Sequence, residues 1–344
     1  LEGKEPPAIL HRYRKAVLRG CKGDRVLKIL VTGGCGYIGS ALIPYLLAND
    51  HEVTNIDTQW FGDGFLPQDN EHLTNIKGDL RDTERLEPIL KQTDAVIHLA
   101  GMTNDNACRA DPRTAVEVNM DAFISLLAHC IGARVRRFIF PSSSAAYGNT
   151  EGPVEESHPL NPTTPYGIYK EACEGIFKLP ENDQMNCYIL RPGGVFGYAP
   201  RMRFDLMVNM MTAHAALRNE INVAGGEQIR PHVHIRDLME VINRLLMINI
   251  PSTTFNVVHE NQSVIHTAYQ VRYMASRVMN KNIRINITER TDDRSYAIDG
   301  AKLKNILFFQ CKRNIHDGVA EICRGFQRGQ WPDALENKVY KNLP

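Results

Sequence analysis

The sequence lacks any pairing of cysteines that would suggest a metal site or a disulfide framework. Its eight cysteines include no Cys-x-x-Cys pair and no group with histidine at zinc-ligand spacing. Scattered single cysteines are typical of reduced thiols in the cytosol. We therefore expect a cytoplasmic protein with no bound metal.

The sequence also lacks an excess of charge of either sign and long apolar runs. Lys plus Arg number 40 against 39 for Asp plus Glu, so bulk electrostatics do not predict a nucleic-acid partner. We expect no apolar stretch that approaches the ~18 residues needed to span a membrane, and we expect no secretory signal. We expect a soluble protein with no membrane partner. Residues 1–27 are basic with a short apolar periodicity, and we interpret them as an N-terminal extension that packs rather than targets.

A glycine-rich turn lies between an apolar run and a helix-like stretch near the start of the chain. The apolar run covers residues 28–31 and the helix-like stretch covers residues 40–47. The turn reads Thr32-Gly33-Gly34-Cys35-Gly36-Tyr37-Ile38-Gly39, with spacings Gly34-x-Gly36-x-x-Gly39 and Gly33-x-x-Gly36-x-x-Gly39. A strand, a glycine turn and a helix N-terminus together cradle a dinucleotide pyrophosphate. The chain is therefore predicted to bind a nicotinamide or flavin dinucleotide.

An acidic residue ends the second strand-like run. Asp57 follows residues 51–56 at about 20 residues past the middle glycine, where a ribose-binding carboxylate is expected. A carboxylate suits a free 2′-hydroxyl and repels a 2′-phosphate, which favours NAD over NADP. The alternative is that Asp57 only starts a turn with Thr58 and Gln59.

Strand-like and helix-like runs alternate through the first half of the chain, which predicts an α/β fold with a Rossmann-type, doubly wound parallel sheet. We place the NAD-binding domain at 28–190 and a mainly substrate-binding, smaller α/β lobe at 191–344, some of whose segments return to the sheet. Helices are expected near 83–91, 112–131, 203–217, 237–248, 263–280 and 314–327. Small residues at the end of one buried strand, Ala100 and Gly101, would allow close approach of a ligand. Asp79 could accept a hydrogen bond from the adenine amino group, or Gly78-Asp79 could be an ordinary turn dipeptide.

Hydroxyl and amine side chains follow the strand at 137–140. The segment Pro141-Ser142-Ser143-Ser144 leaves that strand, and Tyr166 and Lys170 share one face of a later helix at i, i+4 spacing. A nearby ammonium favours the ionised form of a phenol. Tyr166 is thus a candidate acid and base that exchanges a proton with a substrate oxygen held by a serine, while a nicotinamide exchanges a hydride at the same carbon.

At this point the sequence resembles the extended short-chain dehydrogenase/reductases, in particular the NAD-dependent epimerase/dehydratase group that acts on nucleotide sugars. The resemblance runs from about residue 28 to beyond 300. It rests on the glycine turn and on Gly78-Asp79-Leu80, His98-Leu99-Ala100-Gly101, Val118-Asn119, Ser142-Ser143-Ser144-Ala145-Ala146-Tyr147-Gly148, Pro165-Tyr166-Gly167-Ile168-Tyr169-Lys170 and Arg191-Pro192-Gly193-Gly194-Val195-Phe196-Gly197.

The resemblance implies a tightly held NAD and a lobe that grips a nucleoside diphosphate-sugar. It selects Ser143, four residues before the Tyr147-Gly148 pair, as the catalytic serine beside Tyr166 and Lys170. The implied cofactor-binding residues are Gly33, Gly36, Tyr37, Ile38, Asp57, Asp79, Leu80, Leu99, Ala100, Gly101, Asn119, Tyr166 and Lys170. The implied substrate-binding residues are Ser143, Ser144, Arg230 and Arg294. For Asn119 and the two arginines, ordinary helix or surface roles stay open.

Two departures from the family pattern bear on the reaction. Ser143 is followed by Ser144 and Ala145, whereas family dehydratases place an Asp-Glu pair after the catalytic residue. Position 194 is Gly where many epimerases have Asn. The leading hypothesis is an NAD-dependent nucleotide-sugar epimerase; the alternatives are a 4,6-dehydratase or keto-sugar reductase or dehydrogenase, and a catalytically silent NAD-binding protein. The resemblance also predicts a homodimer, through helices that include 112–131 and 165–178.

Overall fold

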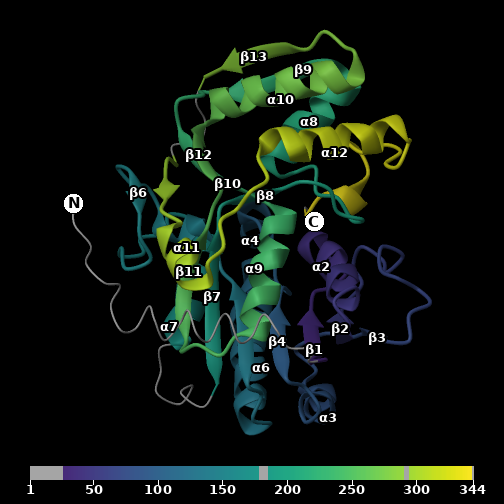
Figure 1. Ribbon diagram of the computed structural model, residues 1–344, viewed down its shortest axis with the longest axis vertical. Coiled ribbons are helices and arrows are strands. Elements are labelled where there is room, and N and C mark those ends of the chain that lie inside the picture. Colours follow the sequence, from purple (N-terminus) through teal and green to yellow (C-terminus); the bar gives the residue numbers. More distant parts are fainter. Residues whose placement is uncertain (1–25, 178–184, 290–293, 343–344) are drawn as a thin grey trace.

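A seven-stranded parallel sheet forms the centre of the computed structural model, which describes residues 26–177, 185–289 and 294–342. The order across the sheet is β3 (Leu73–Lys77), β2 (Glu52–Asp57), β1 (Lys28–Thr32), β4 (Ala95–His98), β5 (Arg137–Pro141), β7 (Asn186–Pro192) and β11 (Thr253–Val257) (Figure 1). The strand order reverses between β1 and β4, which opens a ligand crevice at their carboxyl ends. The predicted Rossmann-type, doubly wound fold is confirmed.

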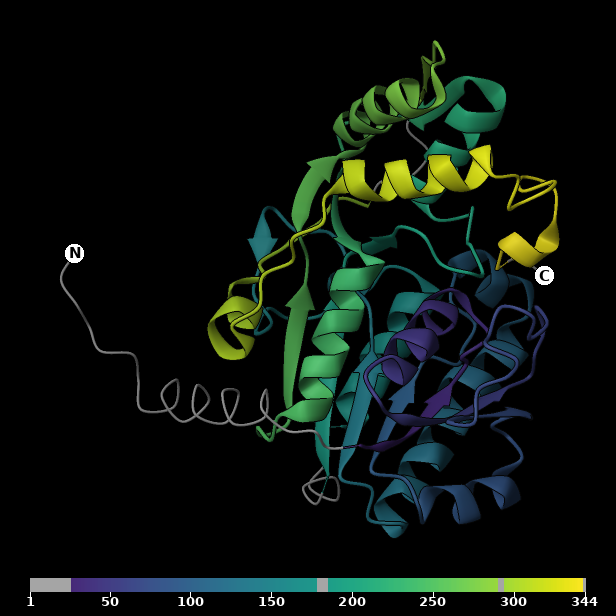
Figure 2. The same ribbon diagram turned by 45° about the vertical axis from the view of Figure 1, so that its right-hand side comes forward.

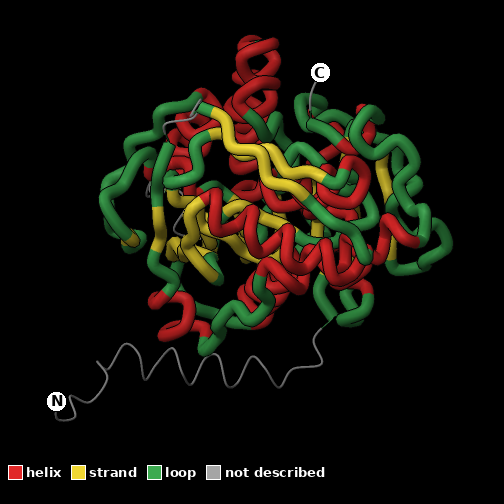
Figure 3. Tube along the Cα trace, turned by 90° about the horizontal axis from the view of Figure 1, so that it is seen from above, coloured by secondary structure: helices red, strands yellow, loops and turns green. Residues whose placement is uncertain are grey.

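Helices cover both faces of this sheet, and in the view from above red helices lie on both sides of the yellow strands (Figure 3). On one face, α2 (Tyr37–Leu47) and α9 (Ile235–Met247) pack on the alternate apolar residues of β1. On the other face, α3 (Leu86–Leu90), α6 (Ala122–Gly132) and α7 (Pro165–Ile176) pack on a phenylalanine-rich core. Short elements join them: η1 (Thr83–Arg85), α4 (Asp105–Ala110), α5 (Pro112–Val116), η2 (Glu117–Asp121) and η3 (Ser144–Tyr147). The seven cysteines in the described residues are buried and free.

One helical run is long and apolar enough, by length and composition, to cross a membrane. Pro112–Gly132 runs through α5, η2 and α6 for 21 residues with a mean hydropathy of 1.3. The expectation that no stretch approaches this length was therefore wrong. In this run 33% of the apolar window is buried, and Phe123, Leu126 and Cys130 pack into the core on one face of the sheet.

A smaller lobe lies beyond the carboxyl ends of the strands (Figure 2). Its strands are β8 (Gly194–Phe196), β9 (Glu220–Ala224), β10 (Ile229–His234), β12 (Glu260–Ser263) and β13 (Arg284–Thr288), with the short pair β6 (Pro153–Val154) and β14 (Ala297–Ile298) beside it. Its helices are α8 (Met207–Arg218), α10 (Val264–Met279) and α12 (Ile315–Gln327). Two further helices are α11 (Ala301–Leu307), which precedes α12 in the chain, and η5 (Lys338–Tyr340), which follows it. Each predicted helix is present within a few residues of its expected bounds.

Segments from the second half of the chain also build the main sheet. Strand β11 pairs with β7, and α9 packs against the same core as β1. The boundary at 190/191 stays a prediction, and of the predicted N-terminal extension residues 1–25 lie outside the described residues.

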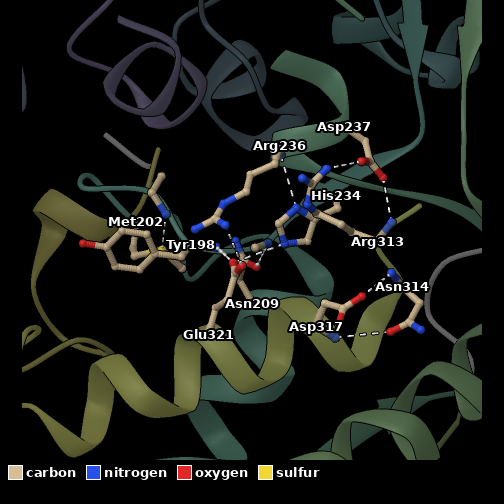
Figure 4. A network of polar contacts seen from close by, with 12 residues as sticks. Tyr198, Met202, Asn209, His234, Arg236, Asp237, Arg313, Asn314, Asp317 and Glu321 are labelled. Atoms are coloured by element: carbon tan, nitrogen blue, oxygen red, sulfur yellow. Dashed lines mark hydrogen bonds and ion pairs between the residues drawn. The ribbon is translucent and has the colours of Figure 1, made fainter. Parts of the chain in front are cut away.

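A polar network joins the lobe helix α12 to the start of α9 (Figure 4). Glu321 of α12 lies 3.2 Å from His234 and 3.6 Å from Arg236. The next residue of α9, Asp237, is buried, and its carboxylate pairs with Arg313 at 2.5 Å. The start of α9, which covers the sheet, is therefore tied to the lobe by charged contacts.

Candidate active site

The glycine turn has no room for side chains at three of its positions, and a Cβ at one of them, Gly34, would lie 2.2 Å from Asn55 Oδ1. Gly33 has φ of +77°, and a Cβ there would lie 2.5 Å from the backbone nitrogen of Ala100. A Cβ at Gly39 would lie 2.4 Å from the Cα of Gly34. At Gly36 a Cβ would meet only the Gly33 carbonyl, at 3.3 Å. Gly33 and Gly39 thus pack the turn against β4 and α2, and Gly36 leaves its outer side open.

The N-terminus of α2 is suited to an anion. Gly36 is its N-cap, no side chain caps it, and its first turn holds no acidic residue. Uncapped backbone N–H groups at a helix N-terminus attract phosphate. The Tyr37 side chain turns away and its hydroxyl donates to the Gly197 carbonyl at 2.8 Å, while Ile38 packs beside the core. The residues present fit a dinucleotide pyrophosphate, with the backbone of residues 37 and 38 as the binding group.

Asp57 makes both the turn contact and a contact with the glycine loop. One carboxylate oxygen accepts from Gln59 N at 2.6 Å, and the other accepts from Cys35 N at 2.9 Å. Burial raises the pKa of Asp57, and these two hydrogen bonds oppose the rise. Each carboxylate oxygen accepts more than one hydrogen bond, so the group retains capacity for ribose hydroxyls.

Asp79 lies in a turn and pairs with a neighbouring arginine. Arg81 contacts it at 2.7 Å and contacts Glu117 at 2.8 Å. Arg81 lowers the pKa of Asp79. The contacts of Asp79 in the structure are those of a turn residue. Its predicted contact with adenine stays a prediction. Leu80, next along the chain, is buried beneath the sheet.

The loop after β4 is held by Asn119. Its side-chain oxygen accepts from Met102 N at 2.9 Å, and its amide nitrogen donates to Met102 O at 3.2 Å. A Cβ at Gly101 would lie 2.7 Å from that oxygen. Asn119 lies in the π-helical segment η2, a type of irregularity frequent at functional sites. Asn119 therefore holds the loop at Gly101 and Met102, and its predicted contact with the cofactor stays a prediction.

Among the three serines after β5, Ser143 has the accessible side chain. Ser142 and Ser144 are 3% and 2% exposed, whereas Ser143 is only partly buried. Ser143 Oγ accepts from Ala145 N at 3.1 Å, which leaves its own hydrogen for a substrate oxygen. The structure thus favours Ser143 for the reacting position and places Ser144 behind it.

Tyr166 and Lys170 lie on one face of α7, whose start is fixed by the Thr164 cap and Pro165. Lys170 Nζ donates to Pro141 O at 2.9 Å, lies 4.3 Å from the centre of the Phe140 ring and lies 5.6 Å from that of Tyr166. Burial lowers the pKa of Lys170 to about 8.

The electrostatics of Tyr166 differ from the expectation. Burial raises the pKa of the Tyr166 phenol, and the main opposing group is the guanidinium of Arg203 rather than Lys170. Lys170 Nζ, 5.6 Å from the centre of the Tyr166 ring, donates to Pro141 O. Arg203 pairs with Asp205 at 2.7 Å and donates to Thr103 at 3.2 Å.

The two predicted substrate arginines come together near the start of α7. Arg230 donates to the backbone carbonyl of Arg294, and Arg294 pairs with Asp105 at 3.0 Å. Asp105 also accepts from Tyr166 N at 3.3 Å. Sequence reasoning missed Asp105, whose partner is 189 residues away, and it assigned Arg203 no role. The acid directly after Asn104, the cap of α4, was the only local signal.

Comparisons with known proteins show the family of the chain and similar folds. The NAD dependent epimerase/dehydratase family matches residues 29–257. A UDP-glucose 4-epimerase of Halalkalibacterium halodurans is 29% identical over 231 residues, which are 62% of this chain and 68% of that protein. Two solved structures cover 88–89% of this chain and 99% of their own, each with a TM-score of 0.76. One is MoeE5 in complex with UDP-glucuronic acid and NAD, at 25% identity; the other is a UDP-N-acetylglucosamine 4-epimerase from Methanobrevibacter ruminantium M1 in complex with UDP-N-acetylmuramic acid, at 27%.

Proposed function

The chain belongs to the NAD-dependent epimerase/dehydratase family, and we propose that it is a nucleotide-sugar epimerase that oxidises a sugar hydroxyl to a ketone and reduces it again on the other face. The observation that carries this proposal is that Ser143, Tyr166 and Lys170 come together near the carboxyl end of β5, at the same edge of the parallel sheet as the glycine turn that follows β1. NAD, the cofactor of the family, supplies the hydride acceptor when it is bound. The backbone at the start of α2 would hold its pyrophosphate, and Asp57 its ribose.

The side chains divide the proton chemistry among them. Ser143 donates a hydrogen bond to the reacting sugar oxygen, and Tyr166 removes the hydroxyl proton and later returns it. Burial raises the pKa of Tyr166, so a nearby positive charge must favour the phenolate. Arg203 supplies part of that charge in this structure, and by resemblance Lys170 supplies more once it contacts the nicotinamide ribose.

We propose that the protein binds its substrate through a nucleoside diphosphate group. Arg230 and Arg294 lie together above the start of α7, and guanidinium groups match phosphate oxygens in charge and geometry. Arg294 would then share its charge between Asp105 and the diphosphate. The UDP-sugar names of the relatives support this substrate class.

The alternatives are weaker on this geometry. A dehydratase needs an acid next to the catalytic serine, and η3 presents Ser144 and Ala145 there. A silent binding protein has no need of an accessible Ser143 beside an intact Tyr166 and Lys170.

To decide among these functions, UDP-, GDP-, CDP- and dTDP-sugars are incubated with the protein without added cofactor and the products are resolved by NMR. Epimers support the proposal, whereas a 4-keto-6-deoxy product or accumulating NADH contradicts it.

We also propose a homodimer through the exposed apolar side chains of α5, α6 and α7. Val116, Ile124 and Ile168 are 41%, 45% and 50% exposed. Burying such residues is the usual driving force for association. Sedimentation should give a dimer for the parent chain and a monomer for Ile124→Glu; a parent chain that sediments as a monomer contradicts the proposal.

A further inference from the structure

Below the proposed catalytic residues, a buried carboxylate joins the elements that carry them. Glu174 follows Lys170 by four residues on α7, as Lys170 follows Tyr166, so the three share one helix face. Glu174 has no exposed surface. Its oxygens accept from Ser142 Oγ at 2.5 Å and from Arg191, whose closest nitrogen lies 2.6 Å away.

The contacts of Glu174 continue through Arg191 into two more segments. Arg191, at the end of β7, also donates to the hydroxyl of Tyr147 at 2.6 Å. That hydroxyl donates to Asn256 of β11 at 2.8 Å. Tyr147 ends the short helix η3, which Ser143 caps. The segment around Ser143 is therefore held to this network on both sides, by Ser142 and by Tyr147.

Two side chains of α7 hold the same strand end one helical turn apart. Lys170 donates to the carbonyl of Pro141, and Glu174 accepts from the hydroxyl of Ser142, the next residue. If Lys170 turns to the cofactor ribose, as the resemblance implies, its contact with Pro141 is lost. The link between Glu174 and Ser142 then remains to hold α7 to this strand end.

We propose that Glu174, acting through Ser142, is a positioning residue that sets the distance between Ser143 on the strand end and Tyr166 on α7. The inference rests on the proposed function, because that distance matters for a sugar oxygen bound by both hydroxyls. A misplacement of about 1 Å in such a site costs roughly 100-fold in rate. The side chains of this network, Glu174, Ser142, Arg191 and Tyr147, are all buried, so we expect its effect to fall on turnover rather than on affinity.

Ser142→Ala tests the proposal, since it removes the hydroxyl while the backbone hydrogen bond from Ser142 N to Leu190 O at 2.7 Å remains. We expect kcat to fall between about 10-fold and 100-fold, with KM and bound NAD within twofold of the parent protein. Amide hydrogen exchange should quicken in residues 142–148 only. Ser142→Thr keeps the hydroxyl and should recover most of the lost kcat.

The matched control is Thr212→Ala, which also removes a buried hydroxyl. The hydroxyl of Thr212 donates to the backbone carbonyl of Val208 at 2.7 Å, within α8. It should leave kcat and exchange at 142–148 unchanged. The proposal is overturned if Ser142→Ala keeps kcat within twofold, or if its loss equals that of the control or follows loss of NAD. If the parent protein turns over no sugar nucleotide, the proposed function fails, and unchanged exchange at 142–148 in Ser142→Ala then still overturns the positioning role.

Discussion

Replacing Lys170 by methionine should stabilise the cofactor-free protein near neutral pH while it abolishes turnover. Burial lowers the pKa of Lys170 from 10.5 to about 8. At about 1.4 kcal/mol per pH unit, this difference means that the charged form costs the folded state about 3 kcal/mol. Methionine removes that cost and loses one hydrogen bond to Pro141, worth about 1 kcal/mol. The variant should therefore be more stable by about 2 kcal/mol at pH 7.

The sign of the difference should reverse with pH. Below pH 8 Lys170 is protonated in both states and the full cost is present. Between about pH 8 and 10.5 the unfolded chain binds the proton and the folded chain does not, so the stability of the parent protein rises relative to the variant. Above this range Lys170→Met should be less stable by about 1 kcal/mol.

Urea unfolding of both proteins from pH 6.5 to 10.5 measures this difference. Lys91→Met serves as the control, because it replaces a lysine side chain that is 65% exposed. A stability difference for Lys170→Met that stays constant across the range would refute the reasoning. Turnover of the parent protein should also fall above about pH 8 as Lys170 loses its proton.

Three further substitutions test the other parts of the site. Tyr166→Phe should lower kcat by at least about 100-fold with NAD content unchanged, in the range of a lost general acid and base; unchanged activity would support the silent binding protein. Asp57→Ser should raise affinity for NADP relative to NAD in binding titrations, and a ratio that does not move would count against Asp57 as the ribose ligand. Gly33→Ala should lose NAD because its Cβ meets Ala100, whereas Gly62→Ala, at a similar φ of +78° with nothing within 4 Å, should retain it; equal losses would remove the steric argument.

Sequence periodicity was sufficient for the main features of the fold because its elements are locally encoded. Alternating apolar strands and a glycine turn predict the doubly wound sheet, and the helix bounds follow from local patterns. The return of β11 to the sheet edge beside β7 depends on pairing across more than 60 residues, for which the local pattern holds no signal. The sequence thus predicts that some segments after residue 191 return to the sheet, but not which ones.

In the site, too, the features set by local sequence were predictable and the contacts between distant segments were not. The spacing of Tyr166 and Lys170 gives a shared helix face, and in the structure Lys170 Nζ donates to the carbonyl of Pro141 at the end of β5 and lies 5.6 Å from the centre of the Tyr166 ring. Their side-chain partners come from elsewhere in the chain: Lys170 is directed to Pro141, and Asp105 joins Arg294 to the start of α7. Such pairings depend on how loops pack, so the sequence could name the reacting groups without naming what orients them.

The most direct test of the account is the fate of the ring hydrogens during turnover. A nucleotide sugar deuterated at every ring carbon is incubated in ordinary water with the protein and no added cofactor, and each epimer is examined by NMR and mass spectrometry. If hydride is taken up and returned within one site, the product keeps all of its deuterium and no NADH accumulates at 340 nm. Loss of deuterium to water, or net formation of NADH, would contradict the central claim.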